Sequence, residues 1–146
     1  MRLKVVAAVL AVFVLAAAGC GDDDDEDSAG ASGAAVTEED LDGRNFVSTE
    51  VEGGNLVSGT EVTLDFDEGG LSVDAGCNQQ FGQYEIDGDV LEIAVMASTM
   101  MGCSAALAAQ DAAIVDLLTS GPTIALDGGT LTITGDDAAL TAEEDN

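Results

Sequence analysis

Apolar and polar residues alternate along most of the chain after residue 40, which predicts a protein built mainly from β-strands. Short turns rich in glycine and aspartate separate the alternating runs. The residues expected to face the interior are Val62, Leu64, Phe66, Leu71, Val73, Ala75, Gly82, Tyr84, Ile86, Leu91, Ile93, Val95, Ile124, Leu126, Leu131, Ile133 and Leu140. The alternation stops at Gly76, as expected where a strand bends. Phe81 has the opposite parity from Tyr84, so we expect it on the outer side of that bend.

One stretch has a helical period instead. Ser104 can cap a helix, and Gly121-Pro122 would end it. Between them, residues at helical spacing are Leu107, Asp111, Ile114, Val115 and Leu118. We therefore expect an α+β fold that is mainly β, with a curved antiparallel sheet or incomplete barrel of about eight strands wrapped on a single α-helix.

The first twenty residues are typical of a secretory signal. Arg2 and Lys4 precede an apolar run at residues 5–18. Fourteen residues of helix rise only about 21 Å, which is short for a hydrocarbon core of about 30 Å. Small residues then lead directly to Cys20. The pattern predicts a signal peptide at residues 1–19.

The Ala17-Ala18-Gly19-Cys20 segment resembles a bacterial lipobox, although Ala17 stands where leucine is usual. The resemblance implies lipidation of Cys20 with acyl chains such as palmitate. The chain would then be extracytoplasmic and anchored to a bacterial membrane, on the outer face of the cell membrane or the periplasmic side. The alternative is an ordinary secretory signal that releases a soluble protein.

Composition divides the remainder of the chain. Residues 20–39 hold the lipidated cysteine, an acidic run at residues 22–27 and a Gly/Ala/Ser-rich stretch, which predict a disordered tether. The acidic run lacks the ligand pattern of an EF-hand. A folded domain is expected at residues 40–143, followed by a frayed tail at residues 144–146.

The charge is strongly acidic. The chain has 29 Asp and Glu residues against 3 Lys and Arg. Only Arg44 among the basic residues follows Cys20, so the mature chain carries about −28. Such a charge repels phosphate backbones, and we expect no nucleic-acid binding. Anionic membrane surfaces would also repel the domain, leaving the lipid on Cys20 as its membrane contact.

The two cysteines of the domain are expected to form a disulfide. Lipidation would consume Cys20, which leaves Cys77 and Cys103 in an oxidising compartment. The alternative is a pair of free buried thiols that behave as small hydrophobic residues.

Three short motifs resemble the META domain of HslJ-like heat-shock lipoproteins. They comprise Gly76, Cys77 and Asn78; Gly82 and Tyr84; and Thr99, Met101 and Cys103. The resemblance extends over about residues 41–142, and it implies a META-like curved sheet and a role in envelope stress response or surface interaction. The chain departs from the family at Phe46, where tryptophan is usual, and at Asp111, where glutamate is usual.

The residue inventory disfavours an enzyme. The chain has no histidine, and the part after Cys20 has no lysine, which removes Ser-His-Asp, Cys-His and Ser-Lys arrangements. No spacing singles out a catalytic pair among the carboxylates. We expect no catalytic residues, cofactor or metal. The expected function is an interaction module for an unknown envelope protein. The alternative is a carrier of a small apolar ligand or acyl chain beside the helix, with Met96, Met100 and Met101 at its mouth.

Overall fold

The computed structural model of the chain describes residues 35–54 and 56–146. The predicted signal peptide, the lipidation site Cys20 and the tether up to residue 34 lie outside the described residues. The elements are α1 (Glu38–Leu41), β1 (Arg44–Glu52), β2 (Thr63–Asp67), β3 (Gly70–Asp74), β4 (Gln79–Gln83), β5 (Glu85–Asp87), β6 (Val90–Glu92), β7 (Met96–Ser98), α2 (Ala105–Thr119), β8 (Thr123–Asp127), β9 (Thr130–Thr134) and β10 (Ala139–Glu144).

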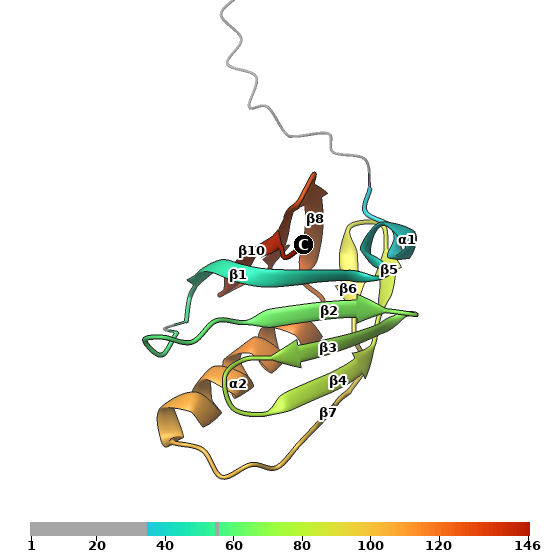
Figure 1. Cartoon of the computed structure of the whole chain (residues 1–146). Helices are drawn as coiled ribbons and strands as arrows, with labels where there is room; N and C mark the ends of the chain where they lie inside the picture. Colours follow the sequence, from blue (N-terminus) through green and yellow to red (C-terminus); the bar gives the residue numbers. More distant parts are fainter. Residues whose placement is uncertain (1–34, 55) are drawn as a thin grey trace, which may run out of the picture. The chain divides into compact units, whose positions relative to one another are not determined.

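The ten strands form one antiparallel sheet in the order β5-β6-β8-β9-β10-β1-β2-β3-β4-β7 (Figure 1). Strands β4 and β5 lie near opposite ends of this order, yet only Tyr84 separates them in the chain. The sheet must therefore curl until its two ends approach each other. The predicted fold class, a mainly β incomplete barrel with one main helix, is confirmed.

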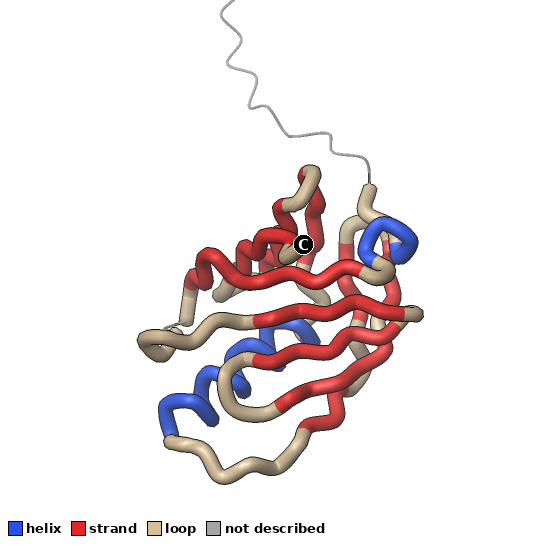
Figure 2. Tube along the Cα trace, viewed as in Figure 1, coloured by secondary structure: helices blue, strands red, loops and turns tan. Residues whose placement is uncertain are grey.

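Helix α2 packs against the apolar face of the sheet (Figure 2). Its start is as predicted, because the Ser104 side chain accepts a hydrogen bond from the Leu107 backbone N–H at 3.3 Å. After its end, Gly121 adopts a left-handed conformation with φ +74°. The buried residues of the helix are Gln110, Asp111, Ile114, Leu117 and Leu118, so the buried face is rotated slightly from the predicted one.

The core contains most of the apolar residues that the alternation places inside, together with three aromatic rings. Val95 was wrongly predicted to face the interior: it precedes β7 at the edge of the sheet and is 76% exposed. Phe46 and Phe66 are fully buried and meet edge to face with centroids 5.9 Å apart. Phe66 meets Tyr84 in the same way at 5.1 Å. Phe81 points out of the sheet and is 45% exposed, as predicted.

The strand count of eight was too low, because the chain crosses between the ends of the sheet twice. Residues 90–95 do not form one strand: β6 ends at Glu92, and the chain moves to the opposite edge to form β7. Strand β7 then spans Met96–Ser98 and pairs with β4. Gly82 allows this crossing, since a Cβ there would lie only 3.0 Å from the Ile93 side chain.

The predicted domain boundaries were wrong at both ends. Val36 is buried in the core, and α1 begins at Glu38, so the domain includes residues that were assigned to the tether. At the other end Glu144 belongs to β10, and the Asp145 N–H donates to the Asn45 carbonyl at 2.9 Å. Backbone pairing with β1 therefore orders most of the predicted tail.

Two three-stranded meanders within the sheet share the same register at an offset of 60 residues. In β2–β3–β4, Thr63 pairs with Asp74 and Asp74 with Gln79. In β8–β9–β10, Thr123 pairs with Thr134 and Thr134 with Ala139. No repeat was recognised in the sequence, because the matching positions conserve the apolar alternation and the turns rather than residue identity.

We predict that Gly53→Ala destabilises the protein more than Gly59→Ala. Both glycines have positive φ, +73° and +86°, and alanine in that conformation costs about 1–2 kcal/mol. A Cβ at Gly53 would also clash with the Asp137 carbonyl in the β9–β10 turn, whereas Gly59 has open space around it. The clash should add about 1–3 kcal/mol. Urea unfolding of both variants measures the difference, and equal losses would contradict the packing described here.

Candidate functional site

Two of the three family-like motifs meet where the β3–β4 turn approaches the start of α2. Cys77 lies in that turn and Cys103 lies just before the helix. The two form a disulfide with their Cα atoms 6.1 Å apart, which confirms the predicted bridge. A covalent bond thus joins the sheet to the helix.

Asn78 connects three segments through its side chain. Its amide oxygen accepts hydrogen bonds from the Thr99 hydroxyl at 3.1 Å and the Met101 N–H at 2.7 Å. Its amide nitrogen donates to a carboxylate oxygen of Asp111 at 3.0 Å, and its backbone N–H donates to the same oxygen at 2.9 Å. The turn, the segment before α2 and the helix itself are therefore held by one residue.

Gln110 extends this connection on the neighbouring position of α2. It is 5% exposed, and its side-chain nitrogen donates to the Ala75 carbonyl and to the Thr60 hydroxyl. Its side-chain oxygen accepts from the Val57 N–H at 2.6 Å. Sequence reasoning missed Gln110 and treated Asp111 only as part of the helical pattern. The available signal was a pair of adjacent polar residues on a helix face expected to be buried.

These groups are suited to holding the fold rather than to a reaction. The sulfur atoms of Cys77 and Cys103 are joined to each other, so neither is a thiolate that could attack a substrate or bind a metal. The amide of Asn78 bonds to protein groups on both its oxygen and its nitrogen. Asp111 is 6% exposed, and its second carboxylate oxygen has no hydrogen-bond partner. The motif therefore forms a structural junction, which we call the Cys77–Asn78 clamp.

Gly82 and Tyr84, the other motif pair, shape the place where the sheet changes ends. Gly82 lies under the crossing chain of residues 93–96. The Tyr84 ring is 3% exposed, and its hydroxyl is buried without a partner. Burial raises the pKa of that hydroxyl, and the carboxylates of Glu38 and Asp42 raise it further. The neutral Tyr84 side chain therefore contributes to the packing of the core.

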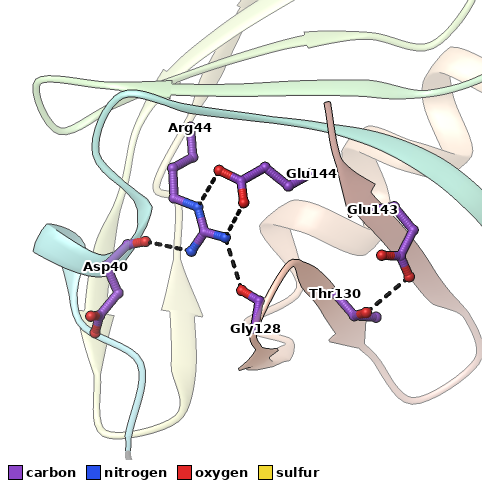
Figure 3. Close-up of polar contacts among 6 residues, drawn as sticks. All are labelled: Asp40, Arg44, Gly128, Thr130, Glu143 and Glu144. Atoms are coloured by element: carbon purple, nitrogen blue, oxygen red, sulfur yellow. Dashed lines mark hydrogen bonds and ion pairs between the residues drawn. The ribbon is translucent and has the colours of Figure 1, made fainter. Parts of the chain in front are cut away.

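A second polar cluster surrounds Arg44, the one Lys or Arg among the described residues (Figure 3). Its guanidinium forms a two-pronged ion pair with Glu144, with N···O distances of 2.9 and 2.6 Å. It also donates to the Gly128 carbonyl at 2.9 Å and the Asp40 carbonyl at 3.0 Å, and it lies 5.0 Å from the centre of the Phe46 ring. Arg44 thus ties α1, the β8–β9 turn and β10 together. No motif had indicated this role, although the scarcity of cations was visible.

The three methionines proposed as a ligand mouth do not line one opening beside the helix. Met96 belongs to β7, packs against the core and borders a groove of about 830 Å³ over β2, β3, β4 and β7. Met100 is 98% exposed and Met101 is 66% exposed in the segment before α2. Apolar side chains of the sheet and of α2 pack against each other in the core.

The fold and the clamp define a class of protein: a curled antiparallel sheet covered by one helix and locked to it by a disulfide. Residues 39–146 match the family model of the META domain. The chain belongs to the META domain family, which confirms the resemblance found in its motifs.

Two solved structures are similar to this chain. One, described as an NMR structure of a protein, is 26% identical with a TM-score of 0.63, covering 74% of this chain and 94% of that chain. The other is an NMR structure of a protein from Burkholderia xenovorans, 18% identical with a TM-score of 0.62, covering 75% and 86% respectively. The second supports the fold alone. No curated protein matches the chain at a significant level.

The described part of the chain contains no helix with the length and apolar character needed to span a membrane.

We predict that exchanging the two clamp side chains costs less stability than changing one of them. Asn78→Asp sets a carboxylate against the Asp111 carboxylate in place of the amide donor, and the lost bond to a charged group should cost about 2–3 kcal/mol at neutral pH. The double variant Asn78→Asp with Asp111→Asn removes the contact between two carboxylates and should recover part of the loss. Recovery is incomplete because one Asp111 oxygen accepts from both the side chain and the backbone N–H of Asn78, and a single amide cannot replace both roles. Urea unfolding measures both. Asp116→Asn on the exposed face of α2 is the control, and equal losses in the single and double variants would reject the clamp.

We predict that the ion pair of Arg44 and Glu144 stabilises the fold only while Glu144 is ionised. The hydrogen bond from Arg44 lowers the pKa of Glu144 in the folded protein. Its contribution is therefore present above the unfolded pKa of about 4.3 and is lost as the pH falls through the lower folded value. Glu144→Gln should reduce the unfolding midpoint at pH 7 and converge with the wild type in acid. Glu50→Gln, an exposed change on β1, serves as control; a pH-independent gap would contradict the assignment.

Proposed function

We propose that this protein is a lipid-anchored, extracytoplasmic META-domain module that acts by binding a partner in the cell envelope rather than by catalysis. The observation that carries the proposal is the clamp. Its motif side chains bond to each other and to α2, so they maintain a rigid domain and are not available to a substrate. A rigid domain of this kind is suited to presenting a binding surface to a partner protein.

The N-terminal pattern and the disulfide support the proposed location outside the cytoplasm. A cysteine directly after Ala17-Ala18-Gly19 supports lipidation of Cys20, with each buried methylene of an acyl chain contributing about 0.8 kcal/mol to membrane binding. The Cys77–Cys103 bridge supports an oxidising compartment. The family resemblance adds a role in envelope stress response.

Carriage of a small apolar ligand or acyl chain is the less supported alternative. It requires space between α2 and the sheet, where the core residues Leu118, Leu131 and Leu140 are fully buried. Native mass measurement of protein purified from its host would reveal a bound lipid-sized mass if this alternative held.

We predict that cells expressing the full chain incorporate a fatty-acid label into it and that Cys20→Ser abolishes the incorporation. The label would be alkyne-tagged palmitate, and membrane fractionation would follow the same samples. Cys77→Ser with Cys103→Ser is the matched control, because it removes two other cysteines and should leave labelling intact. An unlabelled wild-type protein in the soluble fraction would refute the anchor.

A further inference from the structure

A groove crosses the face of the sheet that points away from the core. It lies over β2, β3, β4 and β7, which are neighbours in the sheet (Figure 1), and has a volume of about 830 Å³. Its lining residues Asp65, Asp67, Ser72, Phe81 and Ala97 face away from the core, and no residue of the Cys77–Asn78 clamp lines it.

The register of the strands explains why this face is hollow. Ser72 on β3 lies between Asp65 on β2 and Phe81 on β4. In the next outward row, Gly70 lies between Asp67 and Gln83. Small residues therefore form a floor along β3, and larger side chains rise on both sides. Neighbouring strands are about 4.8 Å apart, so the channel is about two strand spacings, or ~10 Å, across.

The two walls have opposite character. One wall is acidic, with Asp65 and Asp67 two residues apart on the same face of β2. The other is apolar, with Phe81 45% exposed and Val95 76% exposed, next to Met96 and Ala97. Large apolar side chains exposed beside a groove are a common feature of binding surfaces.

No cation of the described residues neutralises the acidic wall. Within these residues the one ion pair joins Arg44 to Glu144, and Arg44 also bonds to two carbonyls. The carboxylates of Asp65 and Asp67 accept no hydrogen bond from the part of the chain that the structure describes. The wall thus carries two carboxylates without a counter-charge.

The corresponding face of the other meander provides an internal comparison. At the offset of 60 residues, Asp65 corresponds to Ala125 and Phe81 to Thr141, with Thr132 between them. Thr130 stands where Gly70 leaves a gap, and its hydroxyl donates to Glu143 at 2.9 Å (Figure 3). Asp67 corresponds to Asp127, so this side keeps one carboxylate, but it lacks Asp65, Phe81 and the gap at Gly70. The groove is produced by particular side chains of β2–β4, not by the fold.

We propose that this groove binds an extended segment of a partner protein in which basic and apolar residues alternate. Side chains of an extended chain alternate in direction and repeat about every 6.6 Å on one side, which is also the expected spacing from Asp65 to Asp67. A segment lying along β3 would set its basic side chains against the two carboxylates and its apolar side chains against Phe81 and Val95. A guanidinium can in addition stack on the Phe81 ring.

Charge decides against a second copy of this chain as the occupant. The chain carries a formal charge of −26, and two acidic walls brought together would repel each other. The acidic surface instead attracts a basic partner and speeds its encounter at low ionic strength. This inference rests on the proposed role as an interaction module and specifies the chemistry of its partner.

The test is fluorescence anisotropy with the purified full chain and a labelled Arg-Leu-Arg-Leu-Arg-Leu peptide. We expect saturable binding that weakens as salt rises from 50 to 200 mM, because the Debye length falls about twofold over this range. Asp65→Asn with Asp67→Asn and, separately, Phe81→Ser should each weaken binding by about tenfold or more, a change of ~1.4 kcal/mol. All three side chains are outward-facing, and circular dichroism would check that the variants fold.

Control variants separate groove binding from general attraction to an acidic chain. Asp127→Asn with Asp136→Asn removes the same charge from the other meander and should change affinity less than about twofold. An Arg-Ser-Arg-Ser-Arg-Ser peptide should bind at least about tenfold more weakly than the leucine peptide. Three results would each overturn the proposal. They are an equal loss of affinity in both double variants, equal affinity for both peptides, and no saturation of binding up to about 1 mM peptide.

Failure of the groove is distinguishable from failure of the proposed function. Palmitate labelling of Cys20 does not depend on Asp65, Asp67 or Phe81, so an anchored protein that ignores the leucine peptide would lose only this inference. An unlabelled protein that binds the peptide through the groove would lose only its membrane address.

Discussion

The junction between the β3–β4 turn and the start of α2 is the constraint on which this fold depends. The curled sheet has one apolar face, and α2 covers it, so the helix must be kept in place for the core to stay dry. The disulfide closes a loop of 26 residues, which on the chain-entropy model contributes about 3.5 kcal/mol. Asn78 donates from the turn to Asp111 of the helix, and Gln110 of the helix donates to the Ala75 carbonyl in the turn. The disulfide limits the distance between the β3–β4 turn and α2, and the hydrogen bonds fix the orientation of α2 relative to the sheet.

The two meanders show how one backbone pattern serves different purposes. Both have the same register, and both place Leu or Val side chains in the core. The meander β2–β3–β4 carries the clamp at its turn and the groove on its outer face. The meander β8–β9–β10 packs its turn against Gly53 instead, and it receives Arg44 through Gly128 and Glu144. The two meanders therefore differ in their turn residues and outward-facing side chains, while their core-facing positions are apolar in both.

The alternation of apolar residues was sufficient to predict the class of fold, since burial on one face of a strand leaves a strong period in the sequence. A helical period with a Ser104 cap predicted the main helix, and the count of cysteines predicted the disulfide partners. The alternation did not reveal where the chain crosses between the ends of the sheet, from β4 to β5 and from β6 to β7. Tyr84 continues the parity of β4 into β5, so nothing local shows that the chain has passed from one end of the sheet to the other. Glu144 resembled a polar tail because its partner, Arg44, lies 100 residues earlier in the chain. Gln110 and the groove likewise depend on register between distant strands, which a single sequence does not reveal.

Native-state hydrogen exchange, measured with and without a reductant, tests the central role of the junction most directly. The account predicts that reduction of Cys77–Cys103 speeds amide exchange selectively at Asn78 and Gln79 and in the first turns of α2, while the amides of β9 and β10 keep their protection. Uniform loss of protection throughout the sheet, or unchanged exchange in α2, would contradict it.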